Sequence, residues 1–263
     1  SLDKSLFPYQ VDAIKNAVKV LKTFYENAPN GKETLYQLCS NEGMPAHRFD
    51  VRELDGTREN PKFTRLTQNN AFPITHYNGD TIISGKNFFN RMCFWMATAS
   101  GKTLLIIKMI EILDALQSKG LIPHKEIMVL FPSEKIQNQF ANAVSEYNRG
   151  RSRTINLISL KEFDETHYQL DIKDEIKVYS YRSDLFSDEE KSKKIDTVTY
   201  DNDGNWYIFM DEAHKGDKED SLRQDYITIM SRNGFLFNFS ATFTDDIDFS
   251  DRPNRNIRGR GPL

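Results

Sequence analysis

The chain has 263 residues, with 35 basic and 38 acidic side chains and a formal net charge of −3. This balance excludes a globally basic nucleic-acid binder of the histone type, but it does not exclude a local basic groove. Hydrophobic residues make up 38% of the sequence, which can supply the core of one large domain or two modest ones.

The start of the chain and its apolar stretches predict a cytoplasmic protein. The N-terminus, SLDKSLFPYQ, lacks the apolar segment of a secretory signal. The longest apolar run, LLIIKMIEIL, is short and contains Lys108 and Glu111, so we expect no membrane span. Cys39 and Cys93 lie far apart without CxxC spacing, which favours two reduced thiols.

Residues 9–28 form the first predicted element. Val11, Ile14, Val18 and Leu21 recur at helical spacing, which predicts an amphipathic helix. We therefore assign residues 1–30 to an N-terminal helical segment.

Residues 31–87 are polar and rich in turn-forming side chains, and we interpret them as an insertion rather than a core layer. One short stretch, FDVREL, is a candidate strand, but it is too weak a pattern to carry a nuclease motif. Surface elaboration, partner docking and nucleic-acid guiding all remain open as roles for this insertion.

From residue 88 short apolar runs alternate with helical patterns. Gly120 ends the first of these helices, Ser133 can cap the second, and Asp203 with Gly204 predicts a hairpin turn before residue 205. The alternation predicts an α/β domain with a mostly parallel sheet over residues 88–245. The expected strands are RMCFWMAT, EIMVLFP, RTINLISL, EIKVYSY, NWYIFM and FLFNFSAT; the expected helices are 102–120, 134–147 and 218–234.

The segment MATASGKT stands between an apolar strand and a strong helix, as a phosphate-binding loop does. Such a loop needs converging backbone N–H groups, a helix N-terminus, a lysine for the outer phosphates and a hydroxyl for Mg²⁺. Lys102 and Thr103 supply the last two. Ala97, Thr98, Ala99 and Ser100 are small enough to let the backbone approach phosphates, and Thr98, Ala99, Ser100 and Gly101 are the loop residues expected to bind the nucleotide. We therefore predict binding of ATP with Mg²⁺ here.

Two acidic residues follow the strand NWYIFM, in the sequence DEAH. Because ligands of parallel sheets bind at the carboxyl ends of strands, these residues are expected near the loop. Asp211 suits Mg²⁺ binding together with Thr103, and Glu212 suits positioning the attacking water. We predict that Lys102, Asp211 and Glu212 carry out hydrolysis.

In this order MATASGKT, DEAH and SAT resemble the motifs of superfamily 2 helicases and translocases. The resemblance implies a RecA-like P-loop NTPase domain. Met96 fits the family, in which the first loop position is often not glycine, whereas Ala99 stands where the family usually has glycine. Such a position needs a permissive backbone angle.

Further motifs match along the chain. LFPYQ resembles the adenine-reading Q motif, which implies that Gln10 pairs with adenine and that Phe7 stacks on it. VLFPSEKIQNQF resembles a motif that contacts the nucleic-acid backbone and offers Ser133 and Gln137; helix capping and surface exposure explain these two residues equally well.

The resemblance also implies residues that couple ATP state to domain movement. These are His214 in DEAH and Ser240 with Thr242 in SAT. The sequences of these motifs resemble, in particular, the ATPase subunit of type III restriction enzymes, which implies a nucleic-acid-dependent helicase or DNA translocase and a modification or specificity subunit as partner. Double-stranded DNA is the expected track, and RNA remains open as the alternative.

Members of superfamily 2 place ATP between two RecA-like lobes, and arginines of the second lobe stabilise the transition state. We expect this chain to hold the first lobe alone, to hydrolyse ATP poorly and not to translocate. Residues 246–263 are polar and arginine-rich, and are predicted to be a linker or disordered tail. Two alternatives remain: a P-loop ATPase that acts on protein, and a non-catalytic nucleic-acid or protein-interaction module.

Overall fold

The fold was analysed in a computed structural model. It describes residues 6–43, 48–50, 82–84, 89–97, 100–163, 174–187, 195–196, 200–211, 227 and 230–241. The described strands and helices are centred on a six-stranded sheet with the order β3-β10-β9-β4-β6-β5. All five neighbouring pairs in this sheet are parallel, which confirms the predicted α/β fold.

The strands of this sheet coincide with the predicted apolar runs. They are β3 (Arg91–Trp95), β4 (Glu126–Phe131), β5 (Thr154–Ser159), β6 (Glu175–Arg182), β9 (Trp206–Asp211) and β10 (Phe235–Ser240). Every residue of β9 and β10 is buried, because these strands lie inside the sheet with both faces covered. The continuous apolar runs in the sequence follow from this position.

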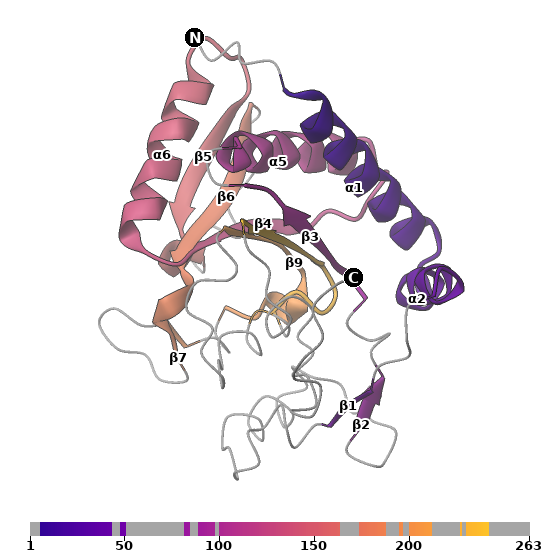
Figure 1. The fold of residues 1–263 in the computed structure, drawn as a ribbon. Helices are drawn as coiled ribbons and strands as arrows, with labels where there is room; N and C mark the ends of the chain where they lie inside the picture. The colour runs from indigo at the N-terminus through magenta and orange to yellow at the C-terminus, as the bar shows by residue number, and fades with distance from the viewer. Residues whose placement is uncertain are drawn as a thin grey trace.

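Three helices cover one face of the sheet (Figure 1). They are α1 (Pro8–Glu26), α5 (Lys102–Ser118) and α6 (Glu134–Asn148), and they bury alternate strand residues in one apolar cluster. Within it Phe94 stacks on Phe239 at 4.4 Å and Phe209 on Phe237 at 4.6 Å between ring centroids. The other strand residues, such as Met128 and Trp206, face a second apolar cluster on the opposite side.

Helix α5 is buried along most of its length, so its sequence is apolar almost all round. It ends as predicted at Gly120, whose φ is +65°. The Gly120 N–H bonds to the Gln117 carbonyl and the Leu121 N–H to the Leu116 carbonyl, both at 2.9 Å, which is the Schellman pattern.

Two sequence expectations were wrong. Helix α2 (Gly31–Asn41) forms where the sequence predicted only turns, and its Leu35 packs into the main core. Its apolar residues are few, so the stabilisation comes from packing on α1 rather than from an amphipathic stripe. No hairpin forms at Asp203: residues Asn202–Gly204 make a short 3-10 helix, η5, because both edges of β9 are already paired, with β4 and β10.

The remaining described elements are small. Strands β1 (Arg48–Asp50) and β2 (Ile82–Ser84) pair antiparallel, and β1 overlaps the candidate strand FDVREL at its first two residues, Phe49 and Asp50. Strands β7 (Phe186–Ser187) and β8 (Ile195–Asp196) form a separate two-stranded sheet, and two further 3-10 helices are η3 (Leu160–Glu162) and η4 (Ser183–Leu185). Of the predicted helix 218–234, residues 227 and 230 are described as helical.

Candidate nucleotide-binding site

The loop between β3 and α5 begins with Met96, the position where a P-loop usually has glycine. Met96 is 7% exposed and its side chain belongs to the main apolar cluster. Its N–H donates to the Ser240 carbonyl at 2.9 Å, which extends the pairing of β3 with β10 by one residue. A buried side chain is therefore required here, and glycine would leave a cavity. Thr98 and Ala99, further along the loop, lie outside the described residues.

Gly101 ends the loop and is the N-cap of α5, with a φ of +84°. A side chain is strained at this angle, and a Cβ would come within 2.6 Å of the Gln10 Nε2 atom. Both constraints require glycine, so the single glycine of MATASGKT stands where the backbone needs it.

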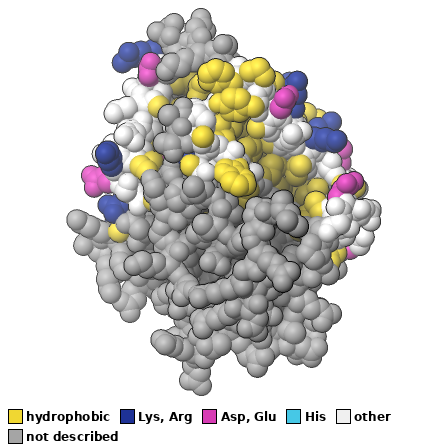
Figure 2. Space-filling view, viewed as in Figure 1, with side chains coloured by type: hydrophobic (Ala, Val, Ile, Leu, Met, Phe, Trp, Pro, Cys, Tyr) yellow, Lys and Arg dark blue, Asp and Glu magenta, His cyan; other side chains and the backbone are white. Residues whose placement is uncertain are grey.

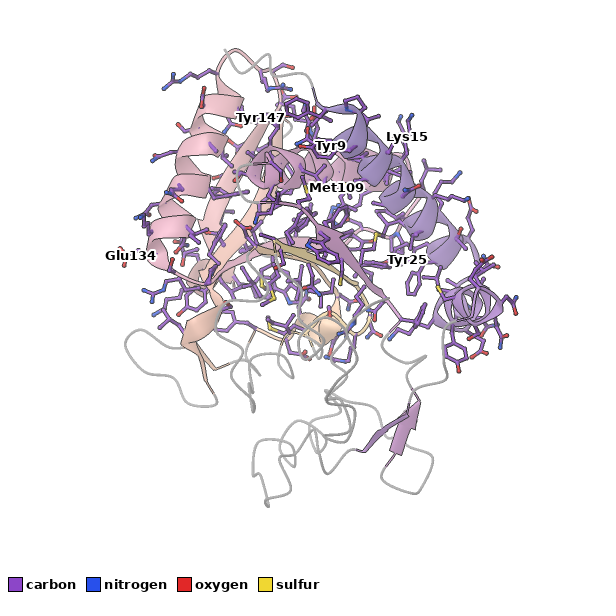
Figure 3. The ribbon with its side chains drawn as sticks, viewed as in Figure 1. Tyr9, Lys15, Tyr25, Met109, Glu134 and Tyr147 are labelled. Carbon is purple, nitrogen blue, oxygen red and sulfur yellow. The ribbon has the colours of Figure 1, made fainter. Side chains whose placement is uncertain are left out.

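The Ser100 carbonyl accepts two side-chain hydrogen bonds from the first turn of α1. The Gln10 Nε2 donates at 2.9 Å and the Tyr9 hydroxyl at 2.8 Å. Tyr9, labelled in Figure 3, belongs to the first turn of α1. The Gln10 Oε1 in turn accepts the Phe7 N–H at 2.9 Å, so Gln10 is buried and fixed at both ends of its amide. An amide has two donors and two acceptor lone pairs, so one of each remains for adenine. The predicted contact of Gln10 with adenine therefore stays a prediction.

Phe7 is the N-cap of α1, three residues before Gln10, and is 60% exposed. Its ring stacks on Tyr9 with 5.6 Å between centroids and 6° between planes. Tyr9 was missed by the sequence reasoning, because nothing in the sequence says that its hydroxyl reaches a loop 91 positions away. The one signal in the sequence was that Tyr9 directly precedes Gln10, the glutamine of the Q-like motif.

Lys102 and Thr103 open helix α5, directly after the loop. Lys102 is buried at 8% exposure and Thr103 is half-buried. The Ser100 hydroxyl is buried as well, and no hydrogen-bond partner for its Oγ exists in the described part of the chain. A helix N-terminus with a lysine and an unsatisfied buried hydroxyl suits a phosphate, since its N–H groups and partial positive charge face the anion.

Asp211 is the last residue of β9 and is 5% exposed. It stands opposite Phe239 in the register of β9 with β10, and Phe239 packs in the cluster under α5. Paired residues of parallel strands share a face, so Asp211 lies on the α5 side of the sheet. Asp211 therefore lies on the face of the sheet that carries Lys102 and Thr103, as its predicted role in binding Mg²⁺ requires. Glu212 and His214 lie outside the described residues.

Ser240 ends β10, between the strand of the loop and the strand of Asp211. It is fully buried and stands opposite Trp95 in the register. The carboxyl ends of β3, β10 and β9 thus bring the loop, Ser240 and Asp211 together at one edge. Thr242 lies outside the described residues.

Ser133 and Gln137 lie past the carboxyl end of β4, the strand next to β9. Ser133 occupies the N-cap position of α6 as predicted, but its side chain makes no capping hydrogen bond among the described residues. The Gln137 Nε2 donates to the Ser180 hydroxyl on β6 at 3.4 Å. The two candidate nucleic-acid residues therefore share the edge of the sheet with the nucleotide loop.

The fold and this edge define a RecA-like helicase-type ATPase domain of superfamily 2. The family model of the type III restriction enzyme res subunit matches residues 3–245, and the chain belongs to that family. Membership makes it a helicase-like ATPase motor domain, which uses a nucleotide and a divalent metal.

Among solved structures, one similar chain is the UvsW helicase from bacteriophage T4, with 16% sequence identity and a TM-score of 0.39. The alignment covers 60% of this chain and 49% of that helicase, so the chain spans about half the length of the relative. Comparison with curated proteins gave no match. In the part of the chain that the structure describes, no helix combines the length and apolar character required to cross a bilayer.

Proposed function

We propose that this chain is the ATP-binding first lobe of a nucleic-acid-dependent DNA translocase of the restriction-enzyme type. The observation that supports the proposal best is the loop before α5. The one glycine of this loop, Gly101, has the left-handed angle that the turn needs, and Lys102 follows it at the start of α5. The Ser100 carbonyl in the same loop is fixed by hydrogen bonds from Tyr9 and Gln10.

The residues divide the chemistry among them. Lys102 would hold the outer phosphates, and Thr103 with Asp211 would hold Mg²⁺, which neutralises charge that develops on the phosphates when it is bound. Glu212 would orient the attacking water and accept its proton. Thr98, Ala99, Ser100 and Gly101 would supply backbone N–H groups, while Phe7 and Gln10 would contact the adenine.

The coupling and track contacts belong to the same proposal. His214, Ser240 and Thr242 would transmit the state of the nucleotide, because Ser240 ends the strand between the loop and Asp211. Ser133 and Gln137 would contact the backbone of double-stranded DNA, so binding would be independent of sequence and would weaken with salt. A second RecA-like lobe and a modification or specificity subunit are the partners proposed for the whole enzyme.

Nucleotide binding with Lys102→Ala as the comparison tests the core of the proposal. Titration calorimetry of ATP with Mg²⁺ should give a Kd for the wild type and a weakening of roughly a hundredfold in the variant, because a buried charge-assisted contact to phosphate is lost. Lys108→Ala is the matched control, since Lys108 lies on the same helix and pairs with Glu111. Equal affinity of Lys102→Ala and wild type would refute the phosphate loop.

ATP hydrolysis by the whole enzyme, in which the second lobe is present, with and without double-stranded DNA separates the two alternatives. Stimulation by DNA that fades with salt supports the motor. Hydrolysis that ignores every nucleic acid favours an ATPase acting on protein, and binding without hydrolysis in any condition favours an interaction module.

A further inference from the structure

Trp95 is the most exposed large hydrophobic residue described, with 74% of its surface accessible. Its two neighbours, Phe94 and Met96, are each 7% exposed and pack in the main core. In Figure 2 hydrophobic side chains gather on the face of the molecule that carries α1 and β3. Trp95 therefore points away from the core at the point where β3 leads into the nucleotide loop.

The indole of Trp95 joins two segments that are distant in sequence. Its Nε1–H donates to the Ala241 carbonyl at 2.9 Å, across 146 positions. Beside this bond the Met96 N–H donates to the Ser240 carbonyl, also at 2.9 Å. The entry to the nucleotide loop is thus tied to the end of β10 by one backbone bond and one side-chain bond.

These two bonds differ in what breaking them costs. The backbone bond continues the sheet and joins buried groups, so it is expensive to break. The indole bond lies at the surface, and water can replace either partner with a small change in free energy. The side-chain bond can therefore open and close while the sheet stays intact.

The bond also stands at a sensitive place. Strand β10 lies between β3 and β9, so residues 240–241 are next to both the nucleotide loop and the strand that ends in Asp211. A change in the loop can reach residue 241 through Trp95 without moving the core. Indole is suited to this task, because it keeps a large ring at the surface and a single donor for one acceptor.

We propose that Trp95 is a positioning residue that couples the nucleotide loop to residues 240–241, and that its indole bond changes when nucleotide binds. The inference rests on the proposed function, since it needs a nucleotide in the loop. Trp95 does not touch the reacting groups in this account; it sets the position of the strand end beside them.

Tryptophan fluorescence can follow this bond directly. The chain has two tryptophans, and the other, Trp206, is fully buried with its Nε1–H bonded to the Tyr200 carbonyl at 3.0 Å. Quenching by acrylamide therefore reports mainly on Trp95. We expect ATP with Mg²⁺ to change the quenching of the wild type, and to leave that of Trp95→Phe unchanged.

Kinetics of the same variants in the whole enzyme, in which the second lobe is present, supply a second readout. Trp95→Phe keeps an aromatic ring but removes the donor, so kcat should fall roughly fivefold, the equivalent of one net hydrogen bond, while KM stays within about twofold. Leu38→Ala, which truncates another exposed apolar side chain, is the matched control and should leave both constants unchanged. Thermal melting of each variant shows that it is folded.

The outcomes separate this inference from the proposed function. If the wild type and Lys102→Ala bind nucleotide alike, both fail. If the wild type binds nucleotide and Lys102→Ala does not, but the quenching of Trp95 ignores the nucleotide, the coupling is overturned. A kcat of Trp95→Phe equal to that of the wild type overturns it as well.

Discussion

The two ends of the central sheet treat buried polar groups in different ways. At the amino end charged groups are paired: Arg232 makes two hydrogen bonds to Asp201, at 2.5 and 2.9 Å, and only its buried Nε has no hydrogen-bond partner among the described residues. The Asn90 amide donates to the Ser231 and Gly234 carbonyls, and the Lys32 amine to the Arg232 carbonyl. At the carboxyl end the Ser100 hydroxyl is buried without a described partner, whereas its carbonyl accepts from Tyr9 and Gln10 and its N–H donates to the Ala97 carbonyl at 3.2 Å.

This contrast separates stability from function on one scaffold. The Arg232–Asp201 ion pair and the Asn90 hydrogen bonds at the amino end hold the starts of β9 and β10 in place. The Ser100 hydroxyl at the carboxyl end lowers the free energy of unfolding while it has no partner, and a ligand that hydrogen-bonds to it would remove this loss. Substitutions at the amino end should therefore change unfolding, and those at the carboxyl end should change binding or hydrolysis.

The largest effect is expected at the amino end, for Arg232→Met. Both side chains of the ion pair are almost fully buried, so the change leaves the Asp201 carboxylate without its counter-charge. The free energy of unfolding should fall by about 3–5 kcal/mol. Urea denaturation measures it.

A double variant serves as the control for this pair. Arg232→Met with Asp201→Leu removes both charges and should recover much of the loss, because a buried ion pair can be replaced by apolar groups at little cost. If Arg232→Met unfolds at the same midpoint urea concentration as the wild type, the polar groups at this end do not stabilise the fold.

At the carboxyl end Glu212→Gln, made in the whole enzyme with its second lobe, should act on hydrolysis alone. If Glu212 accepts the proton of the attacking water, an amide in its place should lower kcat by about a hundredfold with an unchanged midpoint of unfolding. Phosphate release measures the rate and calorimetry of nucleotide binding shows that the site is intact. A kcat within twofold of wild type would remove Glu212 from the reaction.

How much of this could be predicted from the sequence depends on the range of the interactions. The strands were predictable because burial on both faces forces continuous apolar runs, as in WYIFMD and FLFNFS. The loop was predictable because its residue types are fixed by local backbone demands, such as the left-handed angle of Gly101. These are properties of a few neighbouring residues.

The parts that escaped prediction depend on distant contacts. Tyr9 and Trp95 bond to carbonyls 91 and 146 positions away, which no local pattern encodes. Helix α2 has few apolar residues and forms against α1. The prediction of a hairpin at Asp203 was wrong. The chain does turn at this position, but β9 is paired with β4 and β10 and has no free edge for a hairpin partner.

A smaller effect should come from Tyr9→Phe, which removes one of the two hydrogen bonds to the Ser100 carbonyl. Gln10 remains as the other donor, so nucleotide affinity should fall by only about threefold to fivefold, with little change in the free energy of unfolding. Tyr36→Phe on α2 is the matched loss of a hydroxyl away from the loop and should leave affinity unchanged. Equal affinities for both variants would show that Tyr9 does not position the loop.

A different kind of effect, a pH dependence of stability, is expected at the amino end from Lys32. Burial, and then the charges of Arg91 and Arg232, lower the pKa of Lys32 to about 7. Below that pH the native and unfolded states both carry the proton, and the cost of the buried charge is fully present. Between about pH 7 and the unfolded pKa of about 10.4 only the unfolded state binds it, so the free energy of unfolding rises with pH.

Lys32→Met removes this proton, so the free energy of unfolding of the wild type minus that of the variant should increase from pH 7 to pH 9. The slope is at most about 1.4 kcal/mol per pH unit for one group. Lys15→Met on the exposed face of α1 controls for the loss of a lysine charge. If the free energies of unfolding of the wild type and Lys32→Met change in parallel with pH, Lys32 keeps its proton in the native state. The amino end of the sheet would then hold the charge of Lys32 in addition to the Arg232–Asp201 ion pair.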